Sequence, residues 1–168
     1  MIEQVPVTLV THEHSISGEL ATQGSRLLDV LNNQLTDILL IHDVQITSVQ
    51  QYTEPCMVLP AAMIRKGLVN LVILRSSEHE APEKRWFSYV EKQPYHAWLV
   101  LPSCRVEGTL RLTRTSQPMI AIFQQREEFL PVTGAIVTCI NGKSEQASVV
   151  MVQRSSIGLL YVCDPAEI

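Results

Sequence analysis

Three histidines could supply ligands to a metal ion. His12 and His14 are two positions apart, so on a strand both would lie on the same face, and His42 follows later in the same half of the chain. A metal site needs further ligands at a defined spacing from the first two. No third ligand lies at a fixed local spacing from His12 and His14. Solvent-exposed histidines at a loop tip explain the pattern, so we predict no bound metal.

Carboxylates and one cysteine are the other candidates for chemistry. Asp29, Asp37 and Asp43 share a segment, but the first is expected on the polar face of a helix and the others flank a strand. Cys104 stands in a polar turn beside Arg105, which could lower the thiol pKa, yet no base and orienting residue accompany it, so an inert exposed thiol is expected. The sequence also lacks GxxxxGK(S/T), GxGxxG, GxSxG and HExxH. We therefore predict neither an enzyme nor a cofactor.

Basic residues are more frequent in the second half of the chain. Most are expected on solvated strand faces. The alternative is an anion or RNA contact through four arginines: Arg105, Arg111, Arg114 and Arg154. The whole chain has 13 basic and 17 acidic residues and a net charge of −4, which does not favour binding to phosphate backbones.

The elements that would position these residues are mainly strands. Val5, Val7 and Leu9 alternate with other residues, and the alternation resumes with Ile16, Gly18 and Leu20. A glycine inside a strand is typical of a bulge or sharp bend. A short helix is expected at 25–32, with Ser25 as its N-cap. Further strands are expected at 38–49, 57–59 and 68–74, with 60–67 as a connection.

The second half has the same plan in the same order. Ala97, Leu99 and Leu101 begin it, and Gly108 has the phase of Gly18. A second helical insert is expected near 119–122, strands at 130–140 and 151–157, and a hairpin turn at Asn141-Gly142. This internal repeat predicts two units, at 1–75 and 95–168.

The connector at 76–94 has its own composition. It begins with a polar linker, and a short helix is expected at 82–92. Five of the nine aromatic residues of the chain fall at 86–98, which indicates packing against a barrel or a partner, with Trp86 and Phe87 as the contact residues.

A bent hairpin with a glycine in its second strand, then a middle strand and a short final pair, is the plan of small SH3-like barrels. On the stretches 7–20, 39–44 and 58–64, and again on 97–110, 130–138 and 150–157, the chain resembles the Sm-like family. It is also similar to uncharacterised bacterial proteins that carry two such units. The resemblance implies two tandem Sm-like barrels, each with a short helical insert, joined by a short helix.

The turns that would bind RNA in that family depart from its pattern. They correspond here to Pro60–Met63, which is apolar, and to Gln153–Ser156, which keeps one arginine but has neither glycine nor acid. RNA binding is therefore not transferred to these residues. Four cysteines without a CxxC pair, no signal-like start and no apolar run near 20 residues favour a soluble cytoplasmic protein. We expect a non-enzymatic binding or assembly module that acts through protein–protein contacts and associates with itself or with another protein, with no membrane contact.

Overall fold

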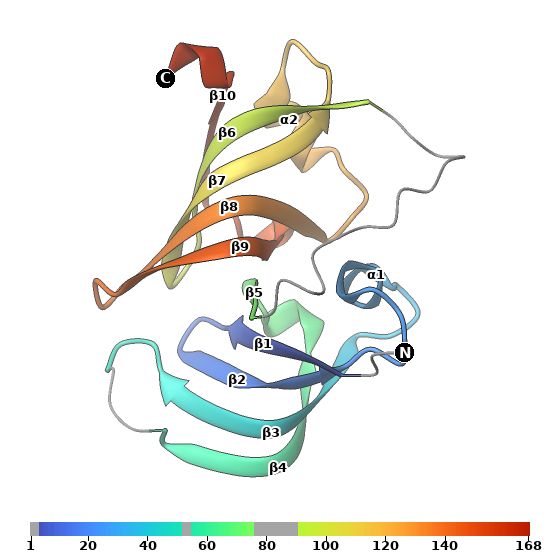
Figure 1. Cartoon of the computed structure of the whole chain (residues 1–168), viewed down its shortest axis with the longest axis vertical. Coiled ribbons are helices and arrows are strands. Elements are labelled where there is room, and N and C mark those ends of the chain that lie inside the picture. Colours follow the sequence, from blue (N-terminus) through green and yellow to red (C-terminus); the bar gives the residue numbers. More distant parts are fainter. Residues whose placement is uncertain (1–3, 52–54, 76–90) are drawn as a thin grey trace.

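Ten strands form a single open antiparallel sheet in the computed structural model, which describes residues 4–51, 55–75 and 91–168 (Figure 1). The prediction of a mainly β protein is confirmed. The strands are β1 (Gln4–Val10), β2 (His14–Ala21), β3 (Ile38–Ser48), β4 (Met57–Arg65), β5 (Leu71–Leu74), β6 (Lys92–Val100), β7 (Cys104–Thr113), β8 (Phe129–Cys139), β9 (Ser144–Gln153) and β10 (Leu159–Cys163). The helices are α1 (Leu27–Asn32) and α2 (Pro118–Phe123), with 3₁₀ turns η1 (Lys66–Leu68), η3 (Arg154–Ser156) and η4 (Pro165–Glu167).

The strand order is the same in the two halves of the sheet. It is β5-β1-β2-β3-β4 in the first half and β10-β6-β7-β8-β9 in the second. The pairing registers also correspond, because Val7 pairs with Gly18 as Ala97 pairs with Gly108. All ladders are antiparallel, including the pairings between strands far apart in sequence, which are β1 with β5, β5 with β9 and β6 with β10.

Gly18 and Gly108 each allow a close approach of the next strand. The β2–β3 register shifts between Ser17 and Glu19, and the β7–β8 register shifts at the corresponding place. A Cβ atom on Gly18 would lie 2.5 Å from the carbonyl oxygen of His42, and one on Gly108 would lie 2.7 Å from Cγ1 of Val132. The predicted bulge at the strand-interior glycines is therefore confirmed, and its cause is the absence of a side chain.

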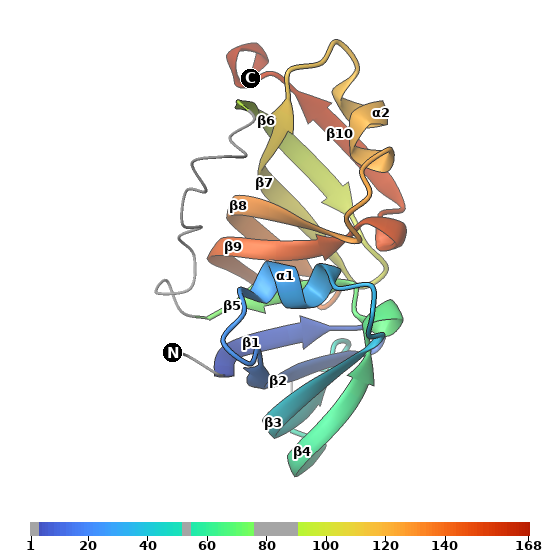
Figure 2. The same ribbon diagram turned by 90° about the vertical axis from the view of Figure 1, so that its right-hand side faces the viewer.

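The two hydrophobic clusters each contain residues from both halves. Phe129, Val149 and Met151 of the second half belong to the cluster formed mainly by the first half. Val10 and Leu71 of the first half belong to the other cluster. Figure 2 shows α1 beside β9 at the level where the halves meet. The halves thus share apolar surface, and each gains burial that a unit of about 70 residues has difficulty achieving alone.

A pair of hydrogen bonds fixes α1 against β8. The Asn32 side chain donates to the Phe129 carbonyl at 3.1 Å and accepts from the Phe129 amide at 2.8 Å. Both helical inserts are confirmed, although the N-cap of α1 is Arg26 and the prediction of Ser25 was wrong. No helix among the described residues is long and apolar enough to cross a membrane.

Several boundaries differ from the sequence-based expectations. The strand expected at 151–157 was wrong in its bounds, because β9 ends at Gln153 and η3 follows it. Residues 57–65 form one continuous strand, so the predicted connection at 60–67 was wrong. Pro60 is compatible with this strand because β4 is at the edge of the sheet, where one side of the backbone needs no ladder partner. Lys92 begins β6 and does not end a helix. The remainder of the helix predicted at 82–92 lies outside the described residues, as do Trp86 and Phe87.

The Asn141-Gly142 turn between β8 and β9 is confirmed. Gly142 has φ of 86°, a conformation that favours glycine. The turn predicted at Pro60–Met63 was wrong, because η1 at Lys66–Leu68 has the position that η3 has in the second half. The C-terminal end of β4 could not be predicted from its apolar sequence, because a short apolar run does not mark where an edge strand ends.

Candidate functional site

The two halves are joined by direct strand pairing. Strand β5 pairs with β1 of its own half and with β9 of the other half, and its four residues are buried. The pairs across the junction are Leu71 with Val152, Val72 with Met151 and Ile73 with Val150. One edge of β5 therefore pairs within the first half. Its other edge pairs with the second half, so β5 joins the two halves of the same chain.

Polar groups continue the junction beyond the ladder. The Gln153 amide donates to the Asn70 carbonyl at 2.9 Å, and the Gln153 side chain donates to the Lys66 carbonyl at 3.1 Å. The Ser156 hydroxyl donates to Oδ1 of Asn70 at 2.9 Å. Asn70, Gln153 and Lys66 are buried, so these bonds satisfy groups that would otherwise be costly to remove from water.

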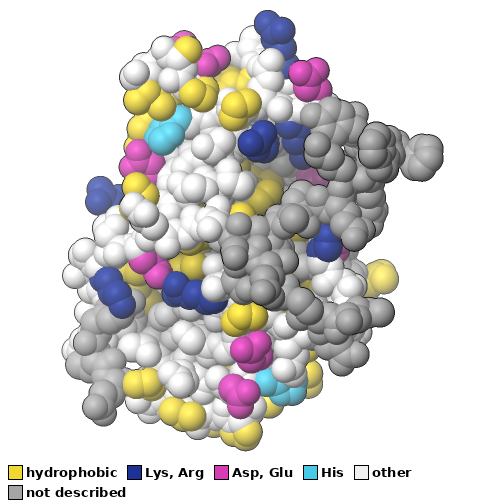
Figure 3. Space-filling model, in the orientation of Figure 1, with side chains coloured by type: hydrophobic (Ala, Val, Ile, Leu, Met, Phe, Trp, Pro, Cys, Tyr) yellow, Lys and Arg dark blue, Asp and Glu magenta, His cyan; other side chains and the backbone are white. Residues whose placement is uncertain are grey.

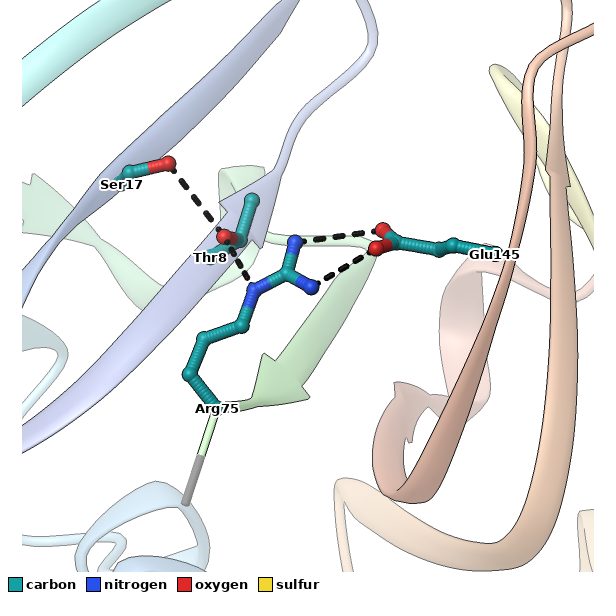
Figure 4. Close-up of polar contacts among 4 residues, drawn as sticks. All are labelled: Thr8, Ser17, Arg75 and Glu145. Carbon is teal, nitrogen blue, oxygen red and sulfur yellow. Dashed lines mark hydrogen bonds and ion pairs between the residues drawn. The ribbon is translucent and has the colours of Figure 1, made fainter.

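Arg75 connects the halves at the other end of β5 (Figure 4). Its Nε donates to Oγ1 of Thr8 at 3.0 Å, and its two terminal nitrogens contact the carboxylate of Glu145 at 2.7 and 3.2 Å. This two-pronged arrangement fixes the relative orientation of both side chains. Ser17 extends the group through its hydroxyl, which lies 3.3 Å from that of Thr8.

Among the residues that the structure describes, the sheet has two open edges, β4 and β10. Apolar side chains are exposed on both: Met57, Val58 and Met63 on β4, and Leu159 and Tyr161 on β10. Figure 3 shows hydrophobic side chains at the bottom of the molecule, where Figure 1 places β4, and near the C-terminus, where β10 lies. An unpaired, apolar strand edge is a template for pairing with another chain.

The four predicted arginines do not gather in one place. Arg105 and Arg111 are both exposed on β7, but six positions along a strand separate them by about 20 Å. Arg111 borders an apolar cleft of about 440 Å³ between α1 and strands β7 to β9. Arg114 is exposed just beyond β7.

Arg154 has a structural contact. Its guanidinium donates to the Phe123 carbonyl at 2.9 Å, at the C-terminal end of α2. Lys66 acts similarly on α1, where its ammonium donates to the carbonyls of Val30 and Asn33, each at 2.8 Å. Burial lowers the pKa of Lys66, and the nearby Asp37 carboxylate opposes this effect. Both cations satisfy helix-end carbonyls, which the sequence did not indicate.

The other candidates for chemistry are dispersed. Asp29 pairs with Arg26, and Asp37 pairs with Arg65 at 3.4 Å. In the described part of the chain, no three His, Cys, Asp or Glu residues are placed to bind a metal ion. The exposed thiol expected at Cys104 was wrong, because Cys104 is buried. Burial, with Cys139 nearby, raises the pKa of Cys104 to about 12, so the lowering by Arg105 that the sequence allowed does not occur.

Comparisons of this chain with protein-family models, with curated proteins and with solved structures gave no match.

Proposed function

We propose that this protein is a non-enzymatic assembly module, built from two Sm-like units, that associates with further copies of itself through the open edges β4 and β10. The observation that carries the proposal is the β5–β9 junction. The chain already joins its own two halves by edge pairing, and no described strand pairs with the same two kinds of edge at the ends of the sheet.

The strand registers identify which edges correspond. Val10 pairs with Leu71 as Val100 pairs with Leu159, so β10 has the position in its half that β5 has in the first. Leu39 pairs with Ile64 as Leu130 pairs with Val152, so β4 corresponds to β9. Pairing of β10 with β4 of a second copy would therefore repeat the junction that lies inside each chain.

The internal junction also supplies a register for this contact. Met151 of β9 is opposite Val72 of β5, and the corresponding residues are Met63 of β4 and Leu160 of β10. The Gln153 amide bonds the Asn70 carbonyl across the junction, and hydrogen-bonded pairs alternate in an antiparallel ladder. Met151 and Val72 therefore form the next hydrogen-bonded pair, and we expect Met63 and Leu160 of a second copy to do the same.

The backbone of β4 supports this register. The Lys66 amide donates to the Asp37 carbonyl at 2.8 Å, toward β3, so alternation directs the amide of Met63 away from β3. Because β4 and β10 are different surfaces, the contact is head-to-tail, and such contacts generate closed rings or open filaments.

The test uses proline to remove one outward amide from each edge. Met63→Pro should disable β4 and leave β10 intact, whereas Leu160→Pro should do the reverse. We expect wild-type protein to form oligomers in light scattering coupled to size exclusion, and each variant to remain monomeric. An equimolar mixture of the two variants should form a dimer and nothing larger, because one intact junction remains.

Met63→Ala and Leu160→Ala are the matched controls, since they shorten the side chains but retain the amides, and both should still associate. Circular dichroism verifies that each variant is folded. Wild-type protein that stays monomeric at high concentration would contradict the proposal. Oligomers of Leu160→Pro alone would instead indicate pairing between two copies of β4.

The alternative of RNA or single-stranded nucleic-acid binding rests on Arg105, Arg111 and Arg114. All three are exposed, and none forms an ion pair with a residue that the structure describes. It predicts binding that weakens with salt. Failure to shift a mixed RNA pool at low salt would remove this alternative without affecting the assembly proposal.

A further inference from the structure

Two cysteines face each other on the paired strands β7 and β8. Cys104 is the register partner of Cys139, so their side chains lie on the same face of the sheet. Both thiols are free, and they pack in the same hydrophobic cluster. They are 35 positions apart in the sequence, which gave no indication of this contact.

The pair is at a non-hydrogen-bonded position of the ladder. The neighbouring residues Ser103 and Ile140 are bonded, with the Ile140 amide donating to the Ser103 carbonyl at 3.0 Å. The Cys139 amide donates to the Lys143 carbonyl at 2.8 Å, so it does not donate to the Cys104 carbonyl. At non-hydrogen-bonded positions the Cα atoms approach to about 4.5 Å, which is within the range that a disulfide spans.

A small reagent can reach this pair. Both cysteines line an open cleft of about 380 Å³ with Pro102, Arg105 and Thr138. Cys139 is only partly buried and also borders a second cleft, of about 200 Å³, with Arg75 and Glu145 at the junction of the halves. A reagent can therefore react first with Cys139, and the buried Cys104 can then react with the modified Cys139.

The first half has no such pair. In the corresponding hairpin, His14 of β2 pairs with Ser48 of β3. The turn that precedes Cys104 also contacts the first half, because the Ser103 hydroxyl donates to the Thr11 carbonyl at 2.9 Å. The two thiols are thus specific to the second half and lie beside the surface that joins the halves.

We propose that Cys104 and Cys139 are a site of covalent modification, at which a small-molecule disulfide oxidises the two thiols to an intramolecular disulfide. The Cys139 thiolate attacks one sulfur of the reagent, forms a mixed disulfide and releases one thiolate. Cys104 then loses its proton to solvent and attacks Sγ of Cys139, which expels the second thiolate. The two cysteines lose two electrons and two protons, and the reagent is reduced to two thiols.

The pKa shifts set the conditions for this reaction. Burial raises the pKa of both thiols, and the Glu145 carboxylate raises that of Cys139 further, whereas Lys143 opposes the rise. Few thiolates exist near neutral pH, so the pair reacts slowly there, and oxidation accelerates as the pH rises.

Oxidation of the intact folded protein by glutathione disulfide at pH 8.5 tests the proposal. In wild-type protein we expect a peptide map to show Cys104 joined to Cys139 with the loss of two hydrogen atoms from that pair, separate from the glutathione adduct that the exposed Cys56 forms, and dithiothreitol to reverse both changes. The Cys56→Ser/Cys163→Ser double variant is the matched control: it lacks the exposed Cys56 thiol, so its whole-protein mass should fall by two hydrogen atoms. Cys104→Ser should stop at the mixed disulfide on Cys139.

A crosslink that involves Cys56 or Cys163 would overturn the proposal. So would a wild-type product that remains a glutathione adduct on Cys139, because the second thiol would then be out of reach. Circular dichroism of the oxidised protein ensures that the link forms in the native fold. If a crosslink appears only in urea, the native pair is not the modification site.

Discussion

Gly18→Ala should destabilise the fold through a single added methyl group. The new Cβ would lie 2.5 Å from the His42 carbonyl oxygen and 2.8 Å from Cγ1 of Ile41, and the first of these contacts is with backbone that cannot rotate away. Either β3 must move outward or the bulge in β2 must open. Both responses disturb the register that places Ile41 in the core.

The expected magnitude follows from two opposing effects. Overpacking a well-packed site costs about 1–3 kcal/mol. Replacing glycine restricts the unfolded chain and returns about 0.4–1 kcal/mol. The two effects differ by about 0–2.6 kcal/mol, and because the contact is with fixed backbone we expect the upper part of this range. The free energy of unfolding should fall by about 1–2.6 kcal/mol, and the melting temperature by roughly 2–10 °C for a chain of this length.

Urea unfolding monitored by circular dichroism measures this change, with Gly67→Ala as the control. Gly67 is exposed in η1, and an added Cβ would meet no atom within 4 Å, so its variant should match or slightly exceed wild-type stability. If both variants have wild-type stability, the close approach at Gly18 is not a constraint and the account of the bulge is incorrect.

Three further predictions concern the junction and the buried thiol. Arg75→Met should cost no more than about 1 kcal/mol, because Arg75 and Glu145 are both partly exposed, and a double-mutant cycle with Glu145→Gln would isolate their coupling. Asn32→Ala should cost about 1–3 kcal/mol, since it leaves the partly buried amide and carbonyl of Phe129 without partners, and thermal unfolding against Asn33→Ala would measure it. The raised pKa of Cys104 stabilises the fold below about pH 9, and this contribution is lost as the pH rises toward 12, by up to about 1.4 kcal/mol per pH unit. Urea unfolding at pH 8 and pH 10 should show a smaller loss for Cys104→Ala than for wild type, and equal losses would refute the role of this thiol.

Local patterns were sufficient to predict many of the elements. Alternation indicated β1, β2, β6 and β7, and the strand-interior glycines indicated the bulges, because both features depend on residues close together in the chain. The Asn141-Gly142 turn was equally local. The end of β4 was not predictable, since Pro60 and its apolar neighbours suit either a turn or an edge strand.

Residue order and alternation therefore account for the mainly β composition and for the corresponding patterns of the two halves. The tertiary structure alone decided that β5 pairs with β9, that Arg75 reaches Glu145 and that Cys104 faces Cys139. Each of these contacts joins residues at least 35 positions apart. Sheet register and the burial shared by the two halves determine which residues pair. Neither can be read from a short stretch of sequence.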